Sequence, residues 1–332
     1  MRPLRITTAF ALASILCVAA GCAAPASDEN VETSHDELRA IGAEPAGHAS
    51  RYPFVLVHGF RGSPSKFGFE NVAAALRSDG HEVIEVTLPP HGSAETRGRA
   101  IASQLESVVA RTGKVNIIAH SMGGLDSRVL VSELGWGDRV ASLTTIATPH
   151  RGSALADAVL GLLPDQSLDE AINAVVDAFD GTYSEMAGGA DVRASYTSLS
   201  EAHAPAFNAA HADDNRVFYQ SWAGVSNVFG IENPDDGPAC GGRWYGGKRR
   251  VDHMDPRLLL SAPIVAHGFE MRPNDGLVTV ESAKWGNFRG CLPADHIDEV
   301  GGGAETGTHW ESGFNHVRFY RSVAFELAGQ GF

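Results

Sequence analysis

Apolar and polar residues follow two patterns along the chain, which predict strands and helices in turn. Continuous apolar runs are typical of strands that are buried on both faces of a parallel sheet. Between these runs, apolar residues recur at helical spacing. Strands that alternate with helices indicate βαβ units and a mostly parallel sheet. The predicted strands are residues 52–60, 82–88, 114–118, 140–148 and 216–224, and the predicted helices are 71–77, 96–111 and 125–134.

The pattern changes over residues 154–199, where helices and glycines occur without a strand. One predicted helix in this insertion carries an apolar face. An ordinary cap helix packed on the body would have such a face, and so would a mobile lid whose apolar face covers a site in water and meets lipid when open. Both interpretations stay open. The residues of this face are Ile172, Val175, Val176 and Phe179.

The C-terminal part of the chain is expected to complete the sheet. Residues 225–250 are irregular and rich in glycine, and the sheet is predicted to resume near residues 274–280. A last helix closes the chain, with Tyr320, Val323 and Leu327 on one face. No internal repeat is present.

Length and charge limit the classes of protein that need to be considered. The chain has 332 residues, of which 43% are hydrophobic, so it can bury the core of one large α/β domain. Its formal net charge is −14. A nucleic-acid partner would call for a basic surface, so this class is excluded.

The N-terminus resembles an export signal. Arg2 and Arg5 precede a mostly apolar run that is too short for a membrane span, and small residues follow. We therefore expect residues 1–22 to be a signal peptide. Cys22 lies in a sequence that resembles a bacterial lipoprotein box, so the protein is expected to be secreted, or anchored to the cell envelope if Cys22 is lipidated. Residues 23–50 are expected to be a disordered spacer and 51–332 the folded domain.

Two of the four cysteines remain after export. Cys17 and Cys22 belong to the signal region, which leaves Cys240 and Cys291 as a pair in the domain. An oxidising compartment favours a disulfide between them. Neither has a Cys or His neighbour at metal-ligand spacing, which disfavours a metal site.

The strongest candidate for chemistry is Ser121, which lies between a predicted strand and a predicted helix in the sequence Ala119-His120-Ser121-Met122-Gly123-Gly124. A sharp strand-turn-helix bend lifts a serine hydroxyl above the end of a sheet. Ala119 and Gly123 are small where the strand and helix backbones come closest, so the bend is sterically allowed. A serine in an ordinary loop is the alternative.

A serine hydroxyl is a poor nucleophile at neutral pH. It needs a histidine to take its proton and a carboxylate to orient that histidine. In α/β folds with the serine at a strand-turn-helix bend, the three residues occur along the chain in the order Ser, Asp or Glu, His. Chain order alone leaves several histidines after Ser121 as candidates.

Six blocks in the same order resemble the Pseudomonas- and Burkholderia-type bacterial true lipases. The resemblance implies the α/β-hydrolase fold, with a mostly parallel central sheet flanked by helices and a helical lid insertion at about 154–199. It also implies that Asp275 is the triad acid and His296 the base. The oxyanion hole would be formed by the backbone N–H groups of Phe60 and Met122. The blocks are residues 52–60, 116–128, 145–153, 218–224, 274–278 and 296–300.

The same resemblance implies a structural calcium ion. Asp255 and Asp298 match the two carboxylate ligands of the family, and the carbonyl oxygens of Gly302 and Thr306 match its remaining protein ligands. Oxygen ligands of this kind suit calcium. Its role would be to hold the loop that carries His296. Two solvated aspartates are the alternative. No organic cofactor is implied.

These observations lead to the hypothesis of an exported serine carboxylic ester hydrolase, a triacylglycerol lipase acting through an acyl-enzyme at a water–lipid interface. A short-chain carboxylesterase or polyester hydrolase with the same triad is the first alternative. A non-catalytic surface lipoprotein that binds acyl ligands is the second. The chain lacks the H-E-x-x-H spacing of metal-dependent hydrolases. The resemblance also makes a lipase-specific foldase a candidate partner.

Overall fold

The structure is a computed structural model, and it describes residues 44–64, 69–162, 190–228, 230–245, 252–302 and 312–332. Contacts divide the chain into residues 1–40 and a second unit, 41–332, which contains every described residue. In the described residues, no helix combines the length and the apolar character that crossing a membrane requires. The predicted signal peptide, most of the predicted spacer, and the predicted lid helix at 172–179 lie outside the described residues.

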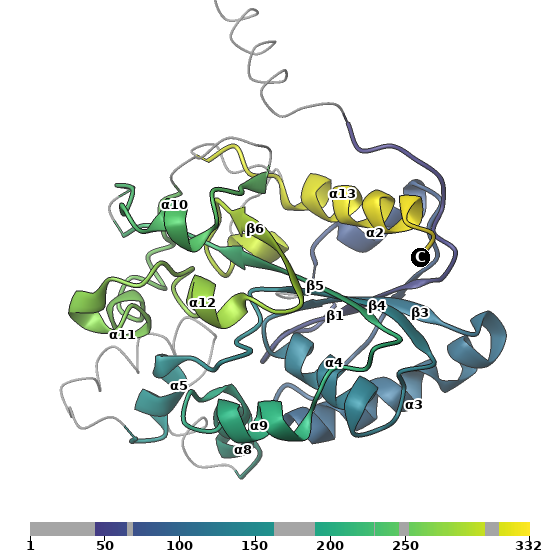
Figure 1. The fold of residues 1–332 in the computed structure, drawn as a ribbon, viewed down its shortest axis with the longest axis horizontal. Helices are drawn as coiled ribbons and strands as arrows, with labels where there is room; N and C mark the ends of the chain where they lie inside the picture. Colours follow the sequence, from purple (N-terminus) through teal and green to yellow (C-terminus); the bar gives the residue numbers. More distant parts are fainter. Residues whose placement is uncertain (1–43, 65–68, 163–189, 229, 246–251, 303–311) are drawn as a thin grey trace, which may run out of the picture. The chain divides into compact units, whose positions relative to one another are not determined.

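The centre of this unit is a six-stranded parallel sheet with the order β2-β1-β3-β4-β5-β6 (Figure 1). This arrangement confirms the predicted α/β fold with its parallel sheet. The strands are β1 (Phe54–Val57), β2 (Val83–Glu85), β3 (Val115–His120), β4 (Val140–Ile146), β5 (Phe218–Gly224) and β6 (Asn287–Leu292).

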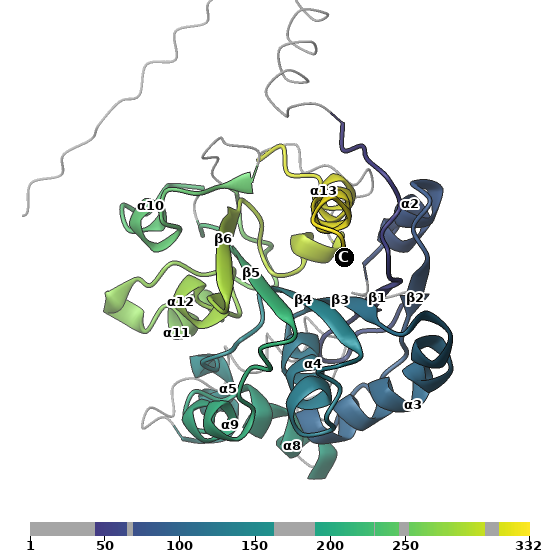
Figure 2. The ribbon, with the colours of Figure 1, turned by 45° about the vertical axis from the view of Figure 1, so that its right-hand side comes forward.

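Helices cover both faces of the sheet, as Figure 2 shows. α3 (Ala94–Thr112) and α4 (Met122–Ser132) lie on one face, and α2 (Val72–Ser78) and α13 (His316–Gly329) lie on the other. In β1, Phe54 and Leu56 pack on the α2 and α13 side, whereas Val55 and Val57 pack on the α3 side. Successive side chains of a strand point to opposite faces. Both faces are buried, so β1 has a continuous apolar sequence.

Shorter helices surround the end of the sheet where the strands terminate. They are α5 (Ala154–Val159), α8 (Ala190–Leu199), α9 (Ala204–Ala210), α10 (Asp236–Ala239), α11 (Ala262–Val265), α12 (Val280–Ala283) and the 3₁₀ turns η3 (Gly268–Glu270) and η4 (Asp298–Val300).

The prediction of a strand at residues 274–280 is wrong. Asn274 and Asp275 form a turn in which side chains accept the backbone N–H groups that a strand would use. Asn274 Oδ1 accepts from Gly276 N, and Asp275 Oδ1 accepts from the N–H groups of residues 277 and 278. The Thr279 side chain then caps α12. Local side-chain acceptors compete with a sheet ladder, and here they prevail. The sixth strand is β6, at residues 287–292.

The predicted disulfide is present between Cys240 and Cys291, with a Cα–Cα distance of 5.5 Å. Both cysteines are fully buried, in a cluster that includes Val278 and Val280. The bridge therefore joins the end of α10 to β6, next to the segment that carries Asp275. Closing a loop of 51 residues limits the unfolded chain, which contributes about 4 kcal/mol in the chain-entropy account.

The last residues of the predicted spacer pack on the folded unit. Glu44 forms ion pairs with Arg318 and Arg321 of α13, and the Ser50 N–H donates to His81 Nδ1. Residues 44–50 thus contact the domain that was expected to begin at residue 51.

Candidate active site

Ser121 lies at the sharp bend between β3 and α4. Its backbone has φ 55° and ψ −133°, a left-handed conformation that a residue with a side chain adopts at a cost of about 1–3 kcal/mol. The bend is held from outside, because Ser121 N donates to Ile146 O and Thr148 Oγ1 donates to Ser121 O. The surrounding strands therefore maintain a strained backbone at the position where the sequence predicts the nucleophile.

The small residues of the motif have the steric role that the sequence predicts. A Cβ atom at Gly123 would lie 2.5 Å from the carbonyl oxygen of Val57, and one at Gly124 would lie 2.1 Å from Thr148 Oγ1. Both are shorter than any allowed contact. α4 can pack on β1 and on the end of β4 only because these two positions are glycines.

Asp275 and His296 are hydrogen-bonded to each other. His296 Nδ1 donates to Asp275 Oδ2 at 2.8 Å, and His296 N donates to Asp275 O at 3.0 Å. The other carboxylate oxygen, Asp275 Oδ1, accepts the N–H groups of Leu277 and Val278. The carboxylate is therefore held on both sides. Because Nδ1 carries the proton, Nε2 of a neutral His296 is free to accept one.

A single cavity brings Ser121 and His296 together. Its wall is mostly apolar. It is built by the ends of β1 and β3, by α5 and α8, by the segment after Asp275 and by the loop after β6. Ser153, one of the polar residues, donates its hydroxyl to Leu277 O. The apolar lining residues are Phe60, Pro149, Leu155, Ala156, Leu199, Leu277, Val278, Ile297 and Val300.

The loop after β1 passes directly beside Ser121. A Cβ atom at Gly59 would lie 3.1 Å from Ser121 Oγ, so the backbone of the next residue, Phe60, lies close to the nucleophile. Met122 is the first residue of α4, and N–H groups in the first turn of a helix have no partner within the helix. The two predicted oxyanion donors thus belong to segments on either side of Ser121.

Arg97 supports this loop, and the sequence analysis did not single it out. Its guanidinium donates to Asp126 Oδ2 at 2.7 Å and to the carbonyl oxygens of His58 and Gly59 at 2.9 and 3.1 Å. Arg97 and Asp126 are both fully buried. The available signal was the position of Arg97, one turn before Ile101 on the buried face of α3. Charged residues are rarely buried unless they are paired.

His58 also holds the loop, as a neutral imidazole. Leu88 N donates to its Nε2, so the proton lies on Nδ1, which donates to Gly59 O at 3.0 Å. Burial lowers the pKa of His58 to about 4, which keeps the ring neutral at physiological pH. His58 thereby connects the end of β2 to the loop beside Ser121.

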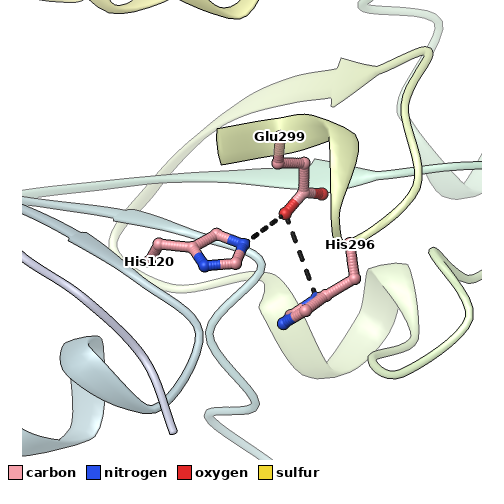
Figure 3. Close-up of side chains that lie close together, drawn as sticks. All are labelled: His120, His296 and Glu299. Carbon is pink, nitrogen blue, oxygen red and sulfur yellow. Dashed lines mark hydrogen bonds and ion pairs between the residues drawn. The ribbon is translucent and has the colours of Figure 1, made fainter. Parts of the chain in front are cut away.

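A second histidine and a glutamate lie beside His296, as Figure 3 shows. His120 Nε2 and Glu299 Oε2 are 2.9 Å apart, and Glu299 Oε2 is 4.0 Å from His296 Nδ1. Burial raises the pKa of Glu299 well above its usual value and lowers that of His120. Both shifts favour the uncharged forms of these side chains. His120 and Glu299 therefore form a buried hydrogen-bonded pair next to the bond between His296 Nδ1 and Asp275.

Three buried carboxylates, those of Asp252, Asp295 and Asp298, converge beside the His296 loop, each offering one oxygen within 4.8 Å of the others. Burial and the charge of Asp298 raise the pKa of Asp295 to about 7. Of the four predicted calcium ligands, only Asp298 belongs to this group.

The other predicted ligands lie elsewhere or are not described. The Asp255 carboxylate is ion-paired with Arg257 at 2.7 Å, while Asp255 N donates to Asp295 Oδ2. Gly302 lies just after η4, where its N–H donates to Ile297 O. Thr306 lies outside the described residues. Asp252 and Asp295, which the sequence analysis missed, lie three residues before Asp255 and Asp298.

Comparison with known proteins agrees with this fold. The family described as "alpha/beta hydrolase fold" matches residues 52–244. A triacylglycerol lipase of Vibrio cholerae is 30% identical and aligns over 85% of this chain and 89% of its own length. A triacylglycerol lipase of Pseudomonas fragi is 26% identical over 76% of this chain and 88% of its own. The solved structure of Staphylococcus hyicus lipase covers 86% of this chain and 98% of its own, with a TM-score of 0.57 and 18% identity.

A serine on a strained strand-to-helix bend, in one cavity with a histidine that a carboxylate holds, defines the class of serine hydrolases. The chain belongs to the α/β hydrolase fold family. It is a serine ester hydrolase, and the resemblance to bacterial true lipases that the sequence indicates is confirmed.

Proposed function

We propose that the protein is an exported triacylglycerol lipase in which Ser121, His296 and Asp275 act as the catalytic triad. The observation that carries this proposal is the apolar cavity that holds both Ser121 and His296, with His296 Nδ1 bonded to Asp275. A long acyl chain requires an apolar wall, and an ester carbonyl requires a nucleophile and a base at one end of it. The lipase names of the aligned relatives support the same substrate class.

In this mechanism, His296 Nε2 takes the proton of Ser121 as Oγ attacks the ester carbonyl carbon. The N–H groups of Phe60 and Met122 stabilise the negative oxygen of the tetrahedral intermediate. His296 then gives its proton to the departing alcohol, which leaves an acyl group on Ser121. A water molecule, deprotonated by His296, attacks the carbonyl carbon of this acyl-enzyme. His296 then returns the proton to Ser121 Oγ as the bond to the acyl group breaks, which releases the fatty acid and restores the free serine. Asp275 keeps the proton of His296 on Nδ1 throughout.

A substrate series tests this function. Purified protein is assayed on p-nitrophenyl esters of increasing chain length and on triacylglycerol emulsions, and a fluorophosphonate probe is used to label the active serine. We expect labelling at Ser121 and a higher rate on long-chain emulsions above the solubility limit. Activity confined to short soluble esters would indicate a carboxylesterase. Absence of labelling at Ser121 would instead indicate a non-catalytic protein that binds acyl ligands.

We also propose a structural calcium ion beside the His296 loop, held by the carboxylates of Asp252, Asp295 and Asp298. The residues fit the ion, because three buried carboxylates that converge within 4.8 Å repel one another and supply the hard oxygen ligands that calcium prefers. Asp252 replaces Asp255 in this proposal, since the Asp255 carboxylate pairs with Arg257. A bound ion would supply positive charge that fixes the segment carrying Asp295, His296 and Asp298.

Removing calcium is expected to lower the melting temperature and the activity together. An ion present at 100 times its Kd stabilises the folded state by about 2.7 kcal/mol. Melting curves and ester hydrolysis are measured with EDTA and then with excess calcium, which should restore both. Asp252→Asn should abolish the calcium response. The matched variant Asp255→Asn should keep the calcium response. If the response were lost in Asp255→Asn and kept in Asp252→Asn, Asp255 would be the calcium ligand instead of Asp252.

We also propose, from the sequence, that the protein is exported, that it has a lid and that a foldase assists its folding. The apolar run after Arg2 and Arg5 supports export, and Cys22 is the residue whose lipidation would anchor the protein. The helix that the sequence predicts at 172–179 is the proposed lid. A lipase-specific foldase is proposed on the family resemblance.

A further inference from the structure

The exposed large apolar side chains of the described residues all belong to η3 or to loops that adjoin α5, α10, α11 and η3. One of the six lies in η3, two lie in the loop between β5 and α10, and the other three directly follow α5, precede α11 or follow η3. Figures 1 and 2 both place α5, α10 and α11 on the same side, away from α3. We call this set the apolar rim. Its members are Leu162, Val228, Ile231, Leu260, Phe269 and Met271.

Elements next to the apolar rim also pack on the wall of the active-site cavity. Ile264 and Val265 of α11 pack against Leu155 and Leu277, and both of those residues line the cavity. Leu162 follows α5, which supplies Leu155 and Ala156 to the same wall. Leu162 and Leu260 are therefore next in sequence to elements that line the cavity or pack on its wall.

The backbone around η3 presents Phe269 to solvent. His267 and Met271, on either side of η3, both have left-handed backbones, with φ 56° and 48°. Asn233 Nδ2 donates to Met271 O at 2.7 Å, which ties this corner to the loop before α10. Phe269 is fully exposed and Met271 is 59% exposed. Two non-glycine residues in a strained conformation thus hold an aromatic side chain in water, where it has no partner in the described residues.

The charges around the corner are paired with each other. Arg272 bonds Glu270 at 2.7 Å, Arg257 bonds Asp255 at 2.7 Å, and His267 contacts Glu201 at 3.0 Å. No excess of either sign remains among these groups to attract a charged partner. The whole chain carries a formal charge of −14, which disfavours an anionic membrane.

We propose that the apolar rim is the surface by which the enzyme binds uncharged lipid. Phe269 and Met271 would enter the lipid first, and the cavity would face the lipid. This inference rests on the proposed function. It assigns the interfacial contact to the α11 and η3 corner, in addition to any contact that a lid makes. Insertion of exposed apolar side chains into the lipid boundary provides the binding free energy.

The experiment uses the full chain with Ser121→Ala, so that lipid is not consumed, and measures binding to phosphatidylcholine vesicles by flotation. Phe269→Ser with Met271→Ser in that background is expected to weaken binding by about tenfold or more, since burying one large apolar side chain is worth at least that factor. The control is Glu106→Ser on α3, which should bind unchanged. With Ser121 restored, the double variant should hydrolyse a soluble short-chain p-nitrophenyl ester at a rate within about twofold of the parent.

Unchanged vesicle binding by the double variant would overturn the proposal. So would binding that requires phosphatidylglycerol, because the rim would then not be a neutral-lipid surface. A parent that is dimeric by light scattering, with a monomeric double variant, would assign the rim to a second copy of the chain instead. Failure of the proposed function is a separate result, since it appears as lost hydrolysis of the soluble ester by the parent and leaves vesicle binding measurable.

Discussion

Replacement of Ser121 by alanine is expected to lower turnover of a soluble ester by about 10⁶-fold, because the residues of a triad act as one unit and the attacking oxygen is lost. His296 and Asp275 would remain bonded, and the oxyanion donors would remain beside the cavity, so a small residual rate should persist. The measurement is kcat on a p-nitrophenyl ester, with circular dichroism and a melting curve to show that the variant is folded.

The matched control is Ser153→Ala. Ser153 lines the same cavity, but its hydroxyl donates to Leu277 O and so has a structural role. Loss of that hydrogen bond should change kcat by less than about tenfold. A Ser121→Ala protein with turnover close to that of the parent would contradict the assignment of the nucleophile, and with it the mechanism.

Replacement of Asp126 by alanine is expected to lower the free energy of unfolding by about 3–5 kcal/mol, because Arg97 would be left buried without its counter-charge. Burial raises the pKa of Asp126 to about 7, so urea unfolding should be measured at a pH near 8, where the pair is charged. Activity should fall as well. Arg97 holds the carbonyl oxygens of His58 and Gly59, and the loop that follows carries the Phe60 donor.

Two comparisons make this result interpretable. Asp126→Asn keeps an acceptor for Arg97 Nε and should lose less stability than alanine does. Glu106→Ala removes one partner of the exposed Arg139–Glu106 ion pair and should cost under about 1 kcal/mol. Equal effects from Asp126→Ala and Glu106→Ala would show that the buried pair does not support the loop.

Local sequence patterns were sufficient to predict those strands that are buried on both faces of the sheet. The apolar runs at β1, β3 and β4 were predicted because every residue of these strands is buried. β6 was missed because its sequence, Asn-Phe-Arg-Gly-Cys-Leu, mixes exposed and buried positions at the edge of the sheet. The false strand at 274–280 had an apolar sequence, but its backbone donors bond the side chains of Asn274 and Asp275.

In the candidate site, too, local sequence predicted some residues, whereas others were recognised only by family resemblance or from the packed structure. The Ser121 bend is a property of a few adjacent residues, so steric reasoning identified both the serine and the need for Gly123. Asp275 and His296 were assigned only by resemblance, since chain order left other histidines open. Arg97 and Asp126 come from different helices, and no local pattern marks two residues as partners before the helices pack. Among the three converging aspartates, family spacing singled out only Asp298.

The sequence by itself therefore determined the alternating order of strands and helices, the bend at Ser121 and the cysteine pair, because each depends on side-chain period, turn sterics or simple counting. Only the tertiary structure decided which carboxylates converge, which charges are buried together and where apolar side chains remain in water. These properties arise when segments far apart in the chain approach one another. A pairwise contact of that kind has no signature in the residues adjacent to either partner.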